Sequence, residues 1–135
     1  MPTLQTADGF ILSIDNDHAL IFPTLQAAMA AGDTDEPIIL SRIHEREMAW
    51  IISFINVFFD QIIYPWTSDN YEAFVKENRL NDAVEMFFNE HLLYTWDLLQ
   101  ALDYLGGGCV YFWLLFYVKA QFRLQASYGD AFTSS

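Results

Sequence analysis

Apolar side chains change their spacing several times along this chain of 135 residues, and each spacing predicts a different element. Apolar and polar residues alternate over Phe10–Ile14, which is typical of a strand buried mainly on one face. The Asp8-Gly9 pair predicts a tight hairpin turn that joins this strand to Thr3–Thr6. Pro37–Leu40 predicts a third short strand. The expected sheet therefore has three strands.

Helical spacing dominates the rest of the chain. Pro23 suits a first helical position, and Thr24–Ala31 predicts a helix after it. Ser41 is the expected N-cap of a long helix, Arg42–Phe59, in which apolar residues recur every three or four positions. This helix carries a second apolar face, so we expect it to be covered on two sides. The residues of that second face are Trp50, Phe54 and Val57.

The last part of the chain predicts two helices joined by Gly106–Gly108. The first is amphipathic and ends near Leu105. The second contains Val110–Val118, an unbroken apolar run of nine residues, five of them aromatic. A helix that is apolar all round has to be covered on more than one side. Because a membrane-spanning helix needs about 20 apolar residues, the run predicts no membrane span.

The stretch between the core helices, Trp66–Asn89, predicts a long excursion with short helical pieces at 70–78 and 84–88. Residues 1–126 form one expected domain, and 127–135 form a polar tail that we expect to fray. Strands followed mostly by helices indicate an α+β fold, with a small three-stranded sheet packed against a helical layer.

Composition narrows the class of protein. Hydrophobic residues make up 53% and the formal net charge is -12, which argues against a disordered chain and against a nucleic-acid binder. Cys109 is the only cysteine, so no internal disulfide forms. The N-terminal residues do not have the form of a secretory signal. We expect an intracellular, reducing location in the cytoplasm or nucleus, with an organelle or a cytoskeletal assembly as alternatives.

The sequence contains only weak signals for catalytic or metal-binding groups. The clusters His44–Glu47 and Asp15–His18 lack the spacing of a zinc site, and solvated helix ends explain them better. Cys109 adjoins a bulky apolar run, so a buried or partner-facing small residue is expected there. We predict no cofactor, no metal and no enzymatic activity.

Several segments, in order along residues 2–122, resemble one known family. LQTADGFILSID is similar to the opening two strands of Skp-type adaptors and elongin C, and DHALIFPTLQAAMAAG is similar to the helix pair that follows. PIIL, IHEREMAWIISFINVFF and FFNEHLLYTWDLLQALDYL resemble the next strand, the long helix and the "L.ELLLAANYLD" segment. The resemblance implies a BTB/POZ fold. It also implies an adaptor that joins a cullin scaffold to a receptor carrying an F-box or a related helical box.

The chain departs from the family pattern in its last part. Asp103 stands where the family has asparagine, and Gly106 stands where it has aspartate. Tyr104 is kept, at a position that contacts the cullin in Skp-type adaptors. The two helices with which those adaptors grip the F-box have no counterpart here. A second hypothesis is therefore a structural subunit of a large assembly without ubiquitin chemistry. A membrane-associated subunit is a more remote third, and a homodimer also stays open.

The resemblance and the aromatic run predict where partners bind. The long helix and the Tyr104 region would face a cullin-like scaffold, and Trp96–Leu105 with the final helix would face a helical receptor box. In the final helix, Phe112, Leu115 and Phe116 are expected to face the core. The remaining face is left for a partner, because aromatic residues are favoured interface anchors. The full set of expected partner-binding residues is Trp50, Phe54, Trp96, Leu99, Leu102, Asp103, Tyr104, Val110, Trp113 and Tyr117.

Overall fold

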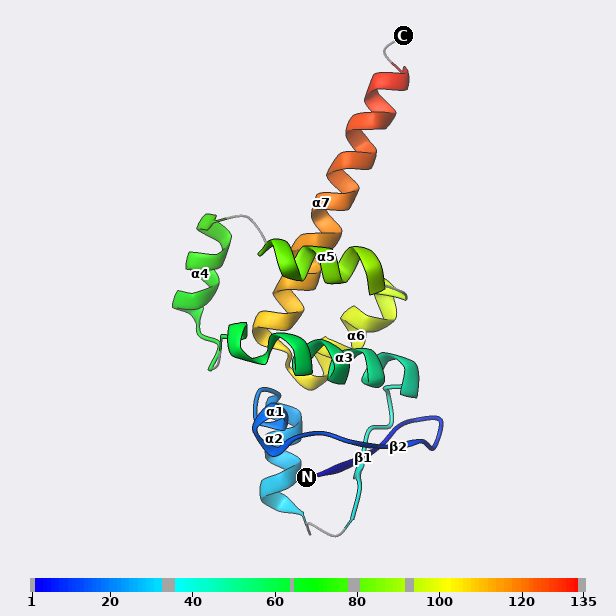
Figure 1. The fold of residues 1–135 in the computed structure, drawn as a ribbon, viewed down its shortest axis with the longest axis vertical. Coiled ribbons are helices and arrows are strands. Elements are labelled where there is room, and N and C mark those ends of the chain that lie inside the picture. Colours follow the sequence, from blue (N-terminus) through cyan, green and yellow to red (C-terminus); the bar gives the residue numbers. More distant parts are fainter. Residues whose placement is uncertain (1, 33–35, 64, 78–80, 92–93, 134–135) are drawn as a thin grey trace.

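The computed structural model describes residues 2–32, 36–63, 65–77, 81–91 and 94–133, with side chains described as far as Gln121. Over these residues a three-stranded sheet accompanies seven α-helices and one 3-10 turn (Figure 1). The elements are β1 Thr3–Gln5, β2 Ile11–Ser13, α1 Asn16–Ala19, α2 Pro23–Ala31, β3 Ile38–Ile39, α3 Glu45–Phe58, η1 Phe59–Gln61, α4 Ser68–Glu77, α5 Asp82–His91, α6 Thr95–Leu105 and α7 Gly108–Thr133. The predicted α+β class and small three-stranded sheet are confirmed. Residues 33–35, between α2 and β3, lie outside the described residues.

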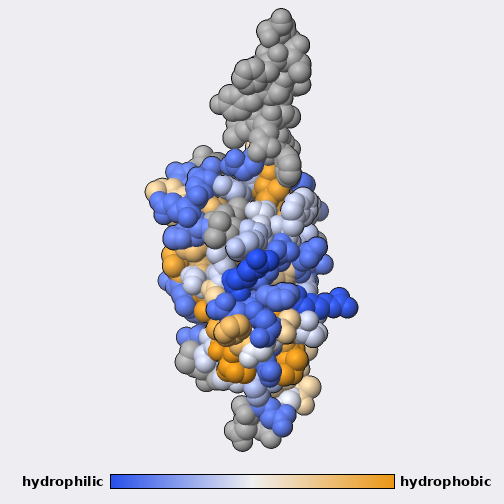
Figure 2. Space-filling view, turned by 90° about the vertical axis from the view of Figure 1, so that its right-hand side faces the viewer, coloured by the Kyte–Doolittle hydropathy of each residue, from blue (hydrophilic) through white to orange (hydrophobic). Residues whose placement is uncertain are grey.

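The sheet has the order β2-β1-β3, with β1 antiparallel to β2 and parallel to β3. Leu4 of β1 is fully buried and faces the core. Gln5 pairs with Ile11 on one side and with Ile39 on the other, and these two isoleucines are exposed. Figure 2 shows apolar surface at the level of the sheet, below a strongly hydrophilic band. The predicted alternation fails at Phe10, which is exposed because it belongs to the turn and not to the strand.

The hairpin turn is tied to the start of α3. The Asp8 carboxylate accepts hydrogen bonds from the Thr6 hydroxyl at 2.6 Å and from the Glu45 backbone N–H at 3.0 Å. These bonds, the Thr6 bond first, lower the pKa of Asp8. The first N–H groups of a helix lack partners within it, so Asp8 caps α3 from a distant part of the chain. Gly9, with a φ of 88°, adopts the left-handed backbone conformation that the predicted turn requires.

The start of α3 was predicted three residues too early. The helix begins at Glu45, and its N-cap residue is His44, not Ser41. Leu40 and Ile43 are both buried, and the turn between them brings both side chains into the core before the helix starts. Of the predicted second face of α3, Phe54 is buried but Val57 is 61% exposed, so the prediction is wrong for Val57.

The core beside the sheet is mainly aliphatic, with α6 packed against both α2 and α3. The Thr24 hydroxyl of α2 donates a hydrogen bond of 2.7 Å to the Tyr104 carbonyl near the end of α6, which gives one of the free C-terminal carbonyls a partner. The fully or almost fully buried members of this core include Leu4, Ile14, Leu25, Leu40, Ile43, Met48, Ile51 and Leu102.

The triple glycine lets neighbouring segments approach closely. Gly106 ends α6 in the left-handed conformation, with a φ of 75°. Gly108 begins α7 with a φ of 47°, and a Cβ atom there would lie 2.9 Å from the Cβ atom of Trp66. Any side chain at Gly108 would push Trp66 away from the start of α7.

Helix α7 runs past the other helices, and its C-terminal part projects beyond them (Figure 1). The helical backbone continues through residues 127–133, where the sequence predicted a frayed tail. In the described part of the chain, no helix combines the length and the apolar character needed to cross a membrane.

The stretch predicted as a long excursion forms two helices that cover α7. The helical pieces expected at 70–78 and 84–88 are confirmed as α4 and α5. Helix α5 buries Val84 and Phe88 completely, whereas α4 buries only Phe74. Their packing against α7 was not predicted.

Candidate protein-interaction surface

The fold divides the ten predicted partner-binding residues into buried and accessible groups. Trp50 and Tyr104 are half-buried, and Trp96 and Asp103 are exposed. The other six are buried within the chain, and a partner could reach them only after a rearrangement. They are Phe54, Leu99, Leu102, Val110, Trp113 and Tyr117.

Buried aromatic rings form one cluster between α3, α5 and α7. The ring centroid of Phe54 lies 5.3 Å from that of Trp50, 5.4 Å from Phe88 and 6.1 Å from Trp113. Tyr117 extends the cluster, with its ring 5.2 Å from Phe88. These separations are typical of favourable aromatic pairs. The predicted anchors on α7 therefore pack against the chain's own rings.

The polar atoms at the edge of this cluster also have partners inside the chain. The Tyr117 hydroxyl donates a hydrogen bond to the side-chain oxygen of Asn89, and the Trp50 indole N–H donates one of 3.1 Å to the His91 carbonyl. Burial raises the pKa of Tyr117, and the negative charge of Glu85 adds to this shift. Both contacts tie α5 to its neighbours.

The predicted division of α7 into a core face and a partner face is wrong. Val110, Trp113 and Tyr117 are buried, whereas Phe112 and Phe116, predicted to face the core, are only half-buried. The run is apolar all round, so its spacing contains no information about which side meets the core.

The half-buried side of α7 is covered by α4 and by Trp66, which precedes α4 in the chain. Trp66 stacks on Phe112 with centroids 5.7 Å apart, and Tyr71 lies 4.8 Å from the same ring. Phe74 meets Phe116 edge to face at 4.7 Å. Phe112 and Phe116 thus have aromatic neighbours from α4 and from Trp66.

The accessible candidate site lies where α6 begins, and we call Arg46, Tyr94, Trp96 and Asp97 the α6 surface. Trp96 is 67% exposed and Tyr94 is 52% exposed. Tyr94 has a φ of 58°, and among the described residues no other non-glycine residue has a positive φ. This uncommon conformation for an aromatic residue occurs at the N-cap of α6.

Arg46 organises the α6 surface. Its guanidinium carbon lies 3.7 Å from the centroid of the Tyr94 ring, within the range of a cation–π contact. Its Nη2 atom is 2.8 Å from the Asp97 carboxylate, and its Nε atom is 3.1 Å from Glu47. The hydrogen bond to Glu47 is the main cause that raises the pKa of Arg46. The guanidinium is therefore held by an aromatic ring and two carboxylates.

Glu47 is an uncommon partner, because its side chain is only 4% exposed. One carboxylate oxygen accepts the Arg46 bond, and the other, Oε2, is buried and has no hydrogen-bond partner among the described residues. A buried charge that loses its partner is costly, so Glu47 restrains Arg46 more firmly than an exposed carboxylate would.

A second accessible patch surrounds Tyr104. The guanidinium carbon of Arg42 lies 6.0 Å from the Tyr104 ring centroid, and Asp103 is exposed beside it. The predicted contacts at Asp103 and Tyr104 are therefore accessible. They lie about two turns of α6 away from Trp96.

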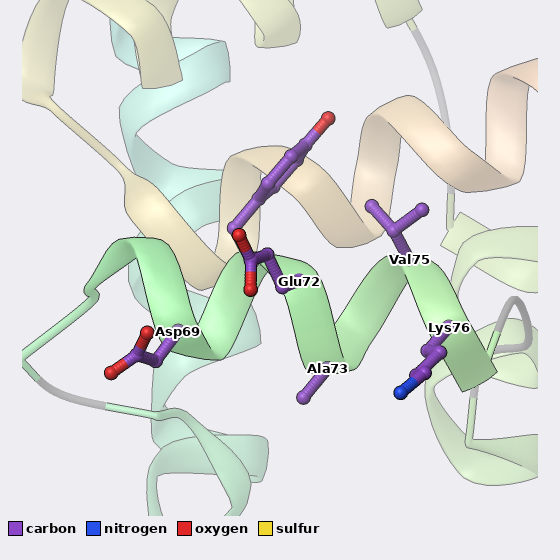
Figure 3. Close-up of a pocket in the computed structure, with 6 residues that line it drawn as sticks. Asp69, Glu72, Ala73, Val75 and Lys76 are labelled. Carbon is purple, nitrogen blue, oxygen red and sulfur yellow. The ribbon is translucent and has the colours of Figure 1, made fainter.

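The structure places the groups that the sequence offered for catalysis or metal binding. Burial raises the pKa of the Cys109 thiol to about 11, so the thiol stays protonated at neutral pH; its predicted burial is confirmed. No three potential metal ligands among the described residues cluster together. A hollow along α4 is lined by residues whose side chains leave the helix in different directions (Figure 3): Asp69, Tyr71, Glu72, Ala73, Val75 and Lys76.

Comparison with models of known protein families and with curated proteins finds no match for this chain. Among the residues of the α6 surface, sequence analysis had selected Trp96 alone. Arg46, Tyr94 and Asp97 were missed, because they come together only when α3 packs beside α6.

Proposed function

We propose that this protein is a non-catalytic adaptor that resembles the Skp and elongin C subunits of cullin-type ubiquitin ligases and has a BTB/POZ-like fold. The exposure of Trp96 beside the Arg46–Tyr94 pair is the observation that carries the proposal. Tryptophan and arginine are enriched among the residues that dominate binding energy at protein interfaces. A tryptophan with two-thirds of its surface exposed contributes little to the fold, and together with a neighbouring arginine and tyrosine it forms the kind of surface that is enriched at protein interfaces.

The two accessible patches suit an adaptor that bridges proteins. In this proposal the α6 surface contacts a helical receptor box, and the patch of Arg42, Asp103 and Tyr104 contacts a cullin-like scaffold. Both patches belong to α6 and to the segment from Arg42 to Glu47, so one rigid unit positions both partners. The mechanism is geometric: the adaptor fixes the distance between receptor and scaffold.

The cover over α7 supports the alternative, a structural subunit of a large assembly without ubiquitin chemistry. A receptor box that bound the final helix would need the aromatic face of that helix to be free. Here Trp113 and Tyr117 are buried against α3 and α5. The aspartate at position 103 also departs from the asparagine of the family.

Affinity purification with chemical crosslinking separates the two functions. Recovery of a cullin and of a box-helix protein, crosslinked near α6, supports the adaptor. Stable recovery of a large complex that lacks both supports the structural subunit and overturns the adaptor.

The contact itself is tested by Trp96→Ala, with Met86→Ala on α5 as the matched control, because Met86 is 59% exposed. We expect Trp96→Ala to weaken partner binding about 30-fold or more, as loss of a hot-spot tryptophan does. The Met86 variant should retain binding. Equal effects of the two substitutions would show that the α6 surface is not the contact.

A further inference from the structure

We propose that α4 is a removable cover, and that the ridge of α7 beneath it binds an aromatic, basic helix of a partner protein. The existence of a partner rests on the proposed function, but the opening of α4 rests on the fold alone. We call the residues Gly108, Phe112 and Phe116 the α7 ridge, because they recur every four positions along one side of α7.

The aromatic residues of the cover follow the α7 ridge in order. Trp66 abuts Gly108 and stacks on Phe112, and the next contact along the chain is Tyr71 on Phe112. Phe74 then reaches Phe116. The cover therefore runs along α7 in the same direction, with aromatic residues spaced Trp-x4-Tyr-x2-Phe. A partner helix with aromatic residues at this spacing would therefore fit the α7 ridge.

Few interactions hold α4 in place. Phe74 is its only buried residue, and Tyr71 and Val75 are 41% and 42% exposed. In the described part of the chain, the hydrogen bonds of Asn70 reach only Thr67 and Pro65, on the N-terminal side of α4 itself. A segment with so little burial belongs to the parts of a protein that open at low cost.

The charge of α4 makes it a poor permanent cover for this protein. Asp69, Glu72 and Glu77 outnumber Lys76 on α4, and the whole chain has a formal net charge of -12. The net negative charge of the chain would favour, over α4, a helix with the same aromatic spacing and with basic residues at the three acidic positions. Lys119 lies 5.7 Å from the Phe116 ring, so these basic residues belong on the outer side of the incoming helix.

Hydrogen exchange of the full-length chain tests the opening. We expect the amides of α4 to exchange at least tenfold faster than those of α6. This exchange should occur through a local opening, so its rate should not change when a low concentration of denaturant is added. Phe74→Ala should accelerate the exchange of α4 about a hundredfold, since the buried aromatic side chain is lost. Val75→Ala, the matched control at an exposed position of the same helix, should change it by less than about threefold. Exchange of α4 at the rate of α6 would overturn the proposal.

A peptide tests the ridge. The probe is a synthetic peptide of residues 66–77 that carries Asp69→Lys, Glu72→Lys and Glu77→Lys. Added to the full-length chain, it should displace α4 and so accelerate exchange of the α4 amides, and its affinity should fall at least tenfold between low and high salt. The same peptide with Tyr71→Ser and Phe74→Ser is the control. It should neither displace α4 nor accelerate exchange of the α4 amides. Binding of the probe without any change in α4 exchange would show that it binds elsewhere, and would refute the ridge as its site.

The two proposals can fail separately. If α4 opens and the probe binds, but purification recovers no cullin or box-helix protein, the proposed adaptor function is wrong and the proposal that α4 is a removable cover is retained. If α4 exchanges only on global unfolding, the cover fails, whereas the contact at Trp96 is unaffected.

Discussion

Helices α4 and α5 both cover α7, but they do so in different ways. Helix α5 contributes two fully buried residues, and its Phe88 contacts rings from both α3 and α7. Helix α4 contributes one buried residue, and among the described residues its aromatic contacts are with α7 and with Trp66, the tryptophan that precedes it. The comparison shows that similar short amphipathic helices can belong to the core or lie over it, depending on how many elements each one joins.

The largest effect is expected at the buried side of α7. Trp113→Glu places a carboxylate against Phe54 at a site that is 8% exposed, so we expect a loss of about 4 kcal/mol or more and no cooperative unfolding transition. Trp96→Glu, at an exposed position, is the control and should change the unfolding free energy by less than about 0.5 kcal/mol. Circular dichroism during urea unfolding measures both. A folded Trp113 variant would mean that α3 does not seal this side of α7.

The contrast between the two covers is tested directly by Phe88→Ala and Phe74→Ala. Removal of the Phe88 ring should cost about 3–5 kcal/mol of global unfolding free energy, because the ring joins three helices. Removal of the Phe74 ring should cost clearly less, because α4 can detach while the rest stays folded. Urea titrations of the two variants give the comparison. Equal losses would place α4 in the same cooperative unit as α5.

A smaller effect is expected from Cys109 at the start of α7. Its pKa is raised from 9.0 to about 11 in the folded chain, so between these pH values the unfolded chain binds fewer protons than the folded one. The stability supplied by the buried thiol is therefore present below pH 9 and falls as the pH rises, by up to about 2–3 kcal/mol near pH 11. Urea titrations from pH 8 to pH 11 should show a steeper decline for the wild type than for Cys109→Ala. Parallel declines would mean that the thiol is solvated in the folded chain.

Local chemistry explains which parts of the fold could be predicted from the sequence. The Asp8-Gly9 turn, the helix from Pro23 and the amphipathic helix before Gly106 each depend on residues close to one another in the chain. The start of α3 could not be predicted in the same way, because its cap comes from Asp8, 37 positions earlier. Trp96 was selected because the family resemblance placed Trp96–Leu105 against a receptor box, but Arg46 could not be predicted beside it, because Arg46 comes from α3.

The sequence by itself determined that Val110–Val118 needs cover on several sides, since no apolar helix of nine residues is stable in water or long enough for a membrane. Only the tertiary structure decided what provides that cover. Periodicity reports the direction of burial when one side of a helix is polar, and this run has no polar side. Side-chain packing broke the symmetry: α5 and α3 enclose Trp113 and Tyr117, and α4 lies over Phe112 and Phe116.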